Sequence, residues 1–148
     1  MQATRFHSPY LLALAVSVTA CLIVGCGNPV EIAPIQGKVT YKGQPLKFGT
    51  VMFQPMSGGQ HAEGLIQPDG SFKLSTHNAG EGARLGTNRI SVRCYENQDP
   101  AKQGGQFEGG QSLGQLLIPI KYTMASSSGL TVDVKAEGNE PVVLELTE

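Results

Sequence analysis

The chain has 148 residues, with 19 Gly, 9 Pro and no Trp, and its formal net charge is −1. Frequent turn residues and the lack of helical periodicity favour an all-β chain of one domain with an amino-terminal appendage. Eleven Lys and Arg stand against twelve Asp and Glu without forming a basic cluster. Nucleic-acid binding through phosphate neutralisation is therefore not expected.

The first 25 residues have the pattern of an export signal. Residues 1–10 contain one Arg and no acid, and residues 11–25 form an uninterrupted run of apolar and small residues. As a helix, residues 11–24 would span about 21 Å, which is short of the ~30 Å hydrocarbon core of a bilayer. A signal peptide over 1–25 is therefore expected, with a permanent transmembrane helix as the alternative.

The apolar run ends at a cysteine that follows a small residue. Residues 23–26, IVGC, resemble the lipobox of bacterial lipoproteins. The resemblance implies that the chain is cut before Cys26 and that its thiol carries diacylglycerol, which anchors the protein to a membrane of the cell envelope. Residues 18–21 have the same pattern, so Cys21 is the alternative lipidation site. Cys26 is preferred because cleavage there uses the whole apolar run as the signal.

Short strands are predicted beyond the signal. Residues 26–36 contain two prolines and no periodicity, so they are interpreted as a tether to a domain at 37–148. The domain alternates apolar and polar residues in short runs bounded by Gly, Pro, Asn and Asp. Seven strands are predicted, at residues 37–42, 49–54, 61–67, 71–76, 87–95, 130–135 and 141–146. The sequence PDG at 68–70 predicts a hairpin turn between two of them.

Alternation assigns one face of each predicted strand to the core. The inward residues are Val39, Tyr41, Val51, Phe53, Ala62, Gly64, Ile66, Phe72, Leu74, Ile90, Val92, Cys94, Leu130, Val132, Val134, Val142, Leu144 and Leu146. Two sheets packed face to face would bury this set without any helix. Cys94 continues an apolar face, so a buried and inert thiol is expected there.

Several segments together carry a resemblance to a known family. GKVTYKGQPL at 37–46, GTVMFQP at 49–55 and the carboxy-terminal SGLTVDVKAEGNEPVVLEL resemble the carboxypeptidase regulatory-like or transthyretin-like β-sandwich of small bacterial lipoproteins. The resemblance covers residues 36–146, apart from the Gly- and Gln-rich segment 96–117. It implies a single Ig-like (transthyretin/prealbumin-like) β-sandwich of about seven strands, in a group whose members generally have no assigned reaction.

The sequence offers few candidates for chemistry. His61 and Glu63 lie two residues apart on an outward strand face, a spacing that supplies two metal ligands, but no local motif provides a third. An exposed polar face explains both residues, so neither a metal nor another cofactor is expected. The chain has no Gly-x-Ser-x-Gly elbow. It also lacks the terminal Tyr-Arg-Gly-Ser of transthyretin-like hydrolases, so we do not expect an enzyme.

A candidate binding surface is expected at the loops and on one outward strand face. It combines the loops 77–86 and 96–117, the latter with Phe107, and the outward residues Arg89, Arg93 and Tyr95. Ordinary solvated surface explains the same residues equally well.

The leading functional hypothesis is an exported, lipid-anchored, non-catalytic module of the bacterial cell envelope, which binds an envelope protein or glycan or has a structural role. One alternative is a hydrolytic or metal-dependent enzyme that uses His61 and Glu63. Another is a structural lipoprotein that self-associates through exposed sheet edges.

Overall fold

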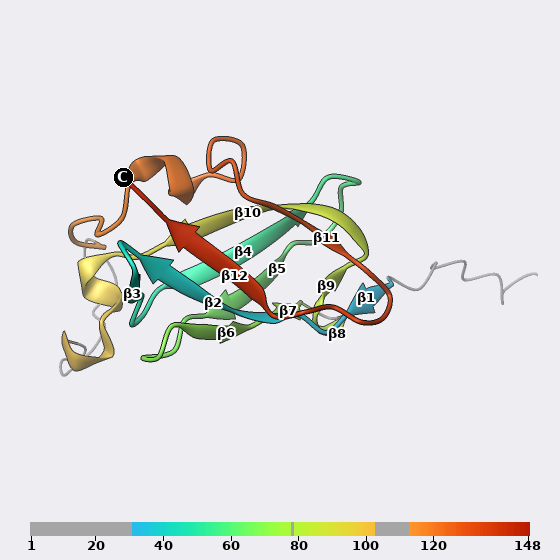
Figure 1. Ribbon diagram of the computed structural model, residues 1–148, viewed down its shortest axis with the longest axis horizontal. Helices are drawn as coiled ribbons and strands as arrows, with labels where there is room; N and C mark the ends of the chain where they lie inside the picture. The colour runs from blue at the N-terminus through green and yellow to red at the C-terminus, as the bar shows by residue number, and fades with distance from the viewer. Residues whose placement is uncertain (1–30, 78, 103–112) are drawn as a thin grey trace, which may run out of the picture.

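A computed structural model describes residues 31–77, 79–102 and 113–148, and these residues form an all-β fold (Figure 1). The strands are β1 (Ile32–Ala33), β2 (Gln36–Tyr41), β3 (Gln44–Pro45), β4 (Thr50–Pro55), β5 (Ala62–Leu65), β6 (Ser71–Lys73), β7 (Ser75–Thr76), β8 (Gly80–Glu81), β9 (Ala83–Arg84), β10 (Gly86–Arg93), β11 (Thr131–Val134) and β12 (Val142–Leu146). Three short 3₁₀ helices accompany them in the described ranges, η2 (Glu96–Gln98), η3 (Pro100–Lys102) and η4 (Ile120–Thr123). The predicted all-β class is confirmed.

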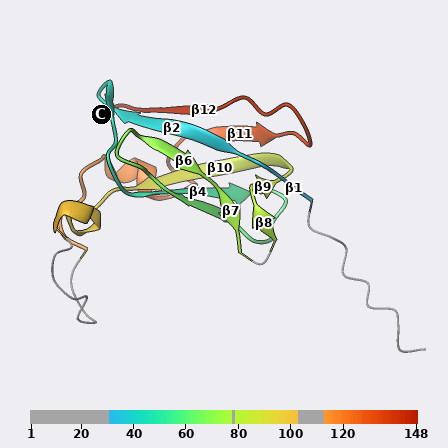
Figure 2. The same cartoon turned by 90° about the horizontal axis from the view of Figure 1, so that it is seen from below.

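The strands form two main sheets that face each other. The larger sheet has the order β11-β10-β4-β5-β7-β8, and its strand pairs are antiparallel. In the smaller sheet β12 runs parallel to β2, and β3 and β6 pair with β2 in antiparallel fashion. Figure 2 shows β2 and β12 lying over β4 and β10. A separate short pair joins β1 to β9.

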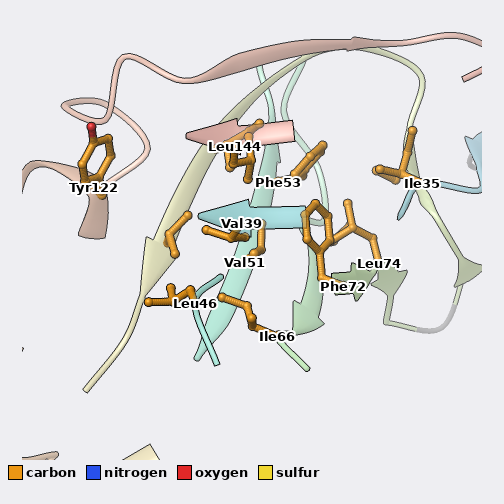
Figure 3. Packing of buried hydrophobic residues seen from close by; sticks show 14 of the residues in the cluster. Ile35, Val39, Leu46, Val51, Phe53, Ile66, Phe72, Leu74, Tyr122 and Leu144 are labelled. Carbon is orange, nitrogen blue, oxygen red and sulfur yellow. The ribbon is translucent and has the colours of Figure 1, made fainter. Parts of the chain in front are cut away.

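The hydrophobic core lies between the two sheets (Figure 3). Val39 from the smaller sheet and Val51, Phe53 and Ile90 from the larger sheet have no exposed surface. The rings of Phe53 and Phe72 pack at a centroid distance of 6.2 Å and an interplanar angle of 54°. Full burial of a side chain of this size contributes about 1.5–3 kcal/mol, so this interface between the sheets supplies much of the stability.

The predicted inward faces agree with the observed burial. The predicted residues that are buried are Val39, Val51, Phe53, Ala62, Gly64, Ile66, Phe72, Leu74, Ile90, Val92, Cys94, Val134, Leu144 and Leu146. Tyr41, Leu130, Val132 and Val142 are half-buried and pack against the margin of the core. The period of two therefore identified the strand residues of the core correctly. Six core residues outside the predicted strand faces were missed: Ala33, Ile35, Leu46, Ala83, Ile118 and Tyr122.

The predicted strand 71–76 is two strands that belong to different sheets. β6 pairs with β2, whereas β7 pairs with β5. Between them the amide of Leu74 donates to the carbonyl of Ile35 at 3.0 Å, and the Leu74 side chain is buried. The chain thus crosses from one sheet to the other and closes one side of the core. Because the alternation continues through Leu74, the sequence carried no sign of the change of partner.

The folded part begins before residue 37, which corrects the end of the expected tether at 26–36. β1 pairs with β9, and both Ala33 and Ile35 belong to the core. The expected loop at 77–86 likewise contains β8 and β9. Strands of two residues are too short to show an alternating pattern, and for this reason the structure has more strands than the seven that were predicted.

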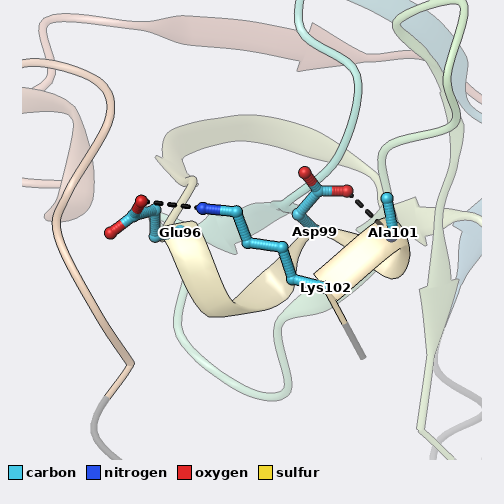
Figure 4. Close-up of polar contacts among 4 residues, drawn as sticks. All are labelled: Glu96, Asp99, Ala101 and Lys102. Carbon is cyan, nitrogen blue, oxygen red and sulfur yellow. Dashed lines mark hydrogen bonds and ion pairs between the residues drawn. The ribbon is translucent and has the colours of Figure 1, made fainter. Parts of the chain in front are cut away.

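The expected Gly- and Gln-rich loop 96–117 starts with local structure. η2 and η3 lie at its beginning, where Lys102 Nζ contacts Glu96 Oε1 at 2.7 Å (Figure 4). This hydrogen bond and the charge of Lys102 lower the pKa of Glu96. The amide of Ala101 donates to Asp99 Oδ1 at 2.9 Å. Phe107 lies outside the described residues.

No helix in the described ranges has the length and apolar composition needed to span a bilayer. The expected signal peptide at 1–25 and both candidate lipidation sites, Cys26 and Cys21, lie outside the described residues.

Asn88 is a polar side chain enclosed in the core. It has no exposed surface, and its Nδ2 donates to the carbonyl oxygens of Arg84 at 2.9 Å and Gly86 at 2.8 Å. Asn88 lies opposite Pro55 of β4, which has no amide hydrogen to donate in the hydrogen bonding between the two strands. Asn88 therefore supplies donors to the turn that leads from β9 into β10.

We expect Asn88→Leu to destabilise the fold by about 1–3 kcal/mol, because two part-buried carbonyls, of Arg84 and Gly86, would lose their donor. Urea unfolding followed by circular dichroism measures the change. The exposed neighbour gives a control, since Thr87→Val is expected to cost less than about 0.5 kcal/mol. Equal midpoints for the two variants would contradict this role of Asn88.

Candidate binding groove

A groove of about 640 Å³ lies on the outer face of β4 and β10. It is lined by Met52, Gln54, Pro55, Met56, Gly58, Arg89, Ser91, Arg93, Thr123, Met124, Ala125 and Ser126. We call it the arginine groove. Its floor comes from the two strands, one wall comes from the turn after β4, and the other wall comes from the segment after η4.

The pleat of β10 places its two arginines on one face. Ile90 and Val92 point into the core, so Arg89, Ser91 and Arg93 point outward. The register sets Arg89 opposite Gln54, Ser91 opposite Met52 and Arg93 opposite Thr50. Four residues of strand separate the two arginine Cα atoms by about 13 Å.

Thr123 at the end of η4 and the three residues after it build the second wall. β11 pairs only with residues 86–89 of β10. Beyond that point the amide of Ile90 donates to the carbonyl of Leu130 at 2.9 Å, and Ser128 Oγ donates to the carbonyl of Ile90. Arg93 Nε donates to the carbonyl of Thr123 at 3.5 Å. These contacts hold η4 and the residues after it beside the groove.

The groove is cationic and partly apolar. Its lining includes two arginines and no carboxylate. The ion pairs found in the described residues join Lys42 to Glu148 and Lys102 to Glu96, so neither arginine is neutralised by one there. Glu63 and Asp133 lie on the same outer face but outside the lining. The arrangement therefore suits an anionic ligand.

Methionines add an apolar surface to both walls. Met56 is 55% exposed and Met124 is 56% exposed, and Met52 lies half-buried on the floor. Flexible thioether side chains adapt to ligands of different shape. Sequence reasoning missed these three residues, because only the strand register and the course of residues 118–128 bring Met124 close to β4.

The four residues of the expected binding surface are not all brought together. Arg89 and Arg93 share the arginine groove, whereas Tyr95 is absent from its lining. Tyr95 lies past the end of β10, where it forms an isolated bridge with Leu116 and donates its amide to Gln98 Oε1 at 2.8 Å. Tyr95 thus helps to position η2.

His61 and Glu63 lie exposed where β5 begins, as the alternation predicted. The described residues contain no group of three or more His, Cys, Asp or Glu side chains that is able to hold a metal ion. Glu63 instead lines a second groove of about 800 Å³ over β5, β6 and β2, together with Lys38 and Lys73. Exposed Leu65 and Val143 also line this groove.

Cys94 is buried as expected, with 1% of its surface exposed. Burial, with a smaller contribution from the charge of Asp99, raises the pKa of its thiol to about 11 from an ordinary value of 9.0. The thiolate is the reactive form, so the fold keeps this side chain unreactive at neutral pH.

Two measurements test the state of Cys94 in a chain with Ser at positions 21 and 26. At pH 8 we expect its reaction with a disulfide reagent to be at least about 100-fold slower in the folded than in the unfolded chain. The reason is that the thiol pKa is about 11 in the folded chain and 9.0 without burial, so the folded chain has far less thiolate.

The second measurement is the stability as a function of pH. The unfolded chain releases the thiol proton first, so stability should be unaffected below pH 9.0 and fall as the pH rises toward about 11. Cys94→Ala should remove this fall. Equal reaction rates in both states would contradict the burial.

No protein-family model, curated protein or solved structure matches the chain.

Proposed function

We propose that the protein is an exported, lipid-anchored, non-catalytic module of the bacterial cell envelope, which binds an anionic envelope partner through the arginine groove. The observation that carries the proposal is the pair Arg89 and Arg93, which line one groove that has no carboxylate in its lining. Exposed charges on a rigid sheet steer association and select partners of opposite charge.

The anchor is supported by the sequence alone. Residues 1–25 have the pattern of an export signal, and residues 23–26 resemble a lipobox. Several acyl chains at ~0.8 kcal/mol per buried CH₂ would hold the protein stably at a membrane, whereas a single chain would be marginal. Cys26 is the proposed attachment point, with Cys21 as the alternative.

We further propose that the fold is an Ig-like sandwich of the transthyretin or carboxypeptidase regulatory-like kind. Support comes from the two facing sheets with a shared core. Binding sites in such folds are displayed on the outside of a rigid frame, which agrees with a groove built on β4 and β10.

Cross-linking of the lipidated protein in its own cells tests the proposal, with partners identified by mass spectrometry. The wild type is compared with Arg89→Gln/Arg93→Gln, which removes two charges from the groove. Lys47→Gln/Lys135→Gln removes two charges from exposed positions outside the groove and serves as the matched control.

We expect the groove variant to lose a specific cross-linked partner that the control variant retains. Identical partners in all three proteins would contradict binding at the groove. Cross-links only between copies of this chain that survive both substitutions would favour the self-associating structural lipoprotein instead.

A further inference from the structure

The two charges of the arginine groove are separated by a nearly uncharged middle. Ser91 lies between Arg89 and Arg93 on β10 and is only 2% exposed, so its neighbours cover it and it adds no charge to the middle of the groove. Met52 lies opposite Ser91 in the register. The exposed side chains of Met56 and Met124 line the groove from its two walls. A ligand therefore meets a cation at each end and thioether groups between them.

An extended peptide has the matching repeat. Its residues advance by about 3.3–3.4 Å, and side chains at positions i, i+2 and i+4 point to the same face. Carboxylates at i and i+4 would then be about 13 Å apart, which is the spacing of Arg89 and Arg93 along β10. The side chain at i+2 would lie midway between the arginines, against the half-buried Met52.

We infer that the arginine groove binds an extended acidic peptide segment, with carboxylates four residues apart and an apolar side chain midway between them. This inference rests on the proposed function, because it names the ligand of the same groove. Guanidinium and carboxylate groups form charge-assisted, often paired hydrogen bonds. The contact from Arg93 Nε to Thr123 holds this arginine toward the wall formed after η4.

The methionines favour a peptide over an acidic glycan. A uronic-acid chain also carries carboxylates, but it would place hydroxyl groups against Met52, Met56 and Met124, and a thioether is only a weak acceptor for them. A Leu, Val or Met side chain would instead be buried against these groups, and each buried CH₂ is favourable. Adaptable thioethers also tolerate different apolar residues at i+2.

Fluorescence anisotropy with the full lipidated protein in micelles of a neutral detergent tests this ligand. The probe is the labelled peptide Gly-Glu-Ser-Leu-Ser-Glu-Gly, whose glutamates are four residues apart. The peptide Gly-Ser-Glu-Leu-Glu-Ser-Gly has the same composition but places them two residues apart. A tri-uronic acid serves as the glycan probe. Binding is measured at low ionic strength, where the Debye length is about 30 Å, and again at high salt.

We expect the first peptide to bind about tenfold more tightly than the second, because only the wider spacing engages both arginines. Arg89→Gln and Arg93→Gln should each remove most of this preference, and high salt should weaken binding. Lys47→Gln/Lys135→Gln should leave it unchanged. Both arginines are exposed, so the variants should fold, and circular dichroism checks this.

Equal affinity for the two peptides, or binding of the uronic acid alone, would overturn the inference of a peptide ligand while the proposed anionic groove would stand. Failure of every probe to bind would also overturn it. The proposed function fails separately, when the cross-links formed in cells do not depend on Arg89 and Arg93.

Discussion

Replacing Gly82 with alanine is expected to destabilise the fold by about 3–5 kcal/mol. Gly82 has a φ of +122°, which residues other than glycine rarely adopt. An added Cβ would also overlap the carbonyl group of Ala33. Its amide also donates to the carbonyl of Leu74 at 2.8 Å. The substitution would push β1 away from β9 and expose Ala33 and Ile35. Urea unfolding followed by circular dichroism measures the loss.

Gly86→Ala separates the two causes of this loss, which are the strain of a positive φ and the overlap of the added Cβ with Ala33. Gly86 also has a positive φ, of +91°, but an added Cβ would meet no atom within 4 Å. Backbone strain alone costs about 1–2 kcal/mol, so this variant should be clearly more stable than Gly82→Ala. Equal losses would mean that the packing of β1 against β9 contributes nothing.

Replacing Cys26 with serine is expected to abolish attachment of lipid. In the lipoprotein family the thiol accepts the diacylglycerol, and a serine hydroxyl is a far weaker nucleophile than a thiolate. The measurement is incorporation of an alkyne-labelled fatty acid in the cells that naturally produce the protein, together with the mass of the amino-terminal peptide. The wild-type peptide should begin at a lipidated Cys26.

Cys21→Ser is the matched control, and it should keep full labelling. Labelling that is lost with Cys21→Ser but kept with Cys26→Ser would assign the anchor to Cys21 instead. A wild-type protein without any fatty acid would contradict the lipid anchor altogether.

Much of the core could be predicted from the sequence because the longer strands have a period of two. Val51 with Phe53, and Ile90 with Val92, are spaced so that a single face is apolar, and each of these side chains is fully buried. The turn at 68–70 was predicted from its residue types, and Asp69 Oδ1 there accepts hydrogen bonds from the amide and hydroxyl of Ser71.

Strand partners were not predictable, because hydrogen bonds between strands involve backbone groups that every residue except proline has in full. Residues 71–76 illustrate this point, since they pair with β2 at one end and with β5 at the other. The arginine groove shows the same limit. Outward arginines on β10 were expected, but Met124 lies about thirty residues further along the chain and reaches the groove only through tertiary structure.

Chemical footprinting of the arginines with phenylglyoxal, quantified by mass spectrometry, tests most directly whether a partner occupies the arginine groove in cells. Modification is compared between the protein in intact cells and the purified protein in micelles. Arg84 lies outside the groove and serves as an internal control. We expect Arg89 and Arg93 to react several-fold more slowly in cells, because a bound partner covers them, while Arg84 reacts equally in both. Unchanged rates for all three arginines would contradict a groove that is occupied in the envelope.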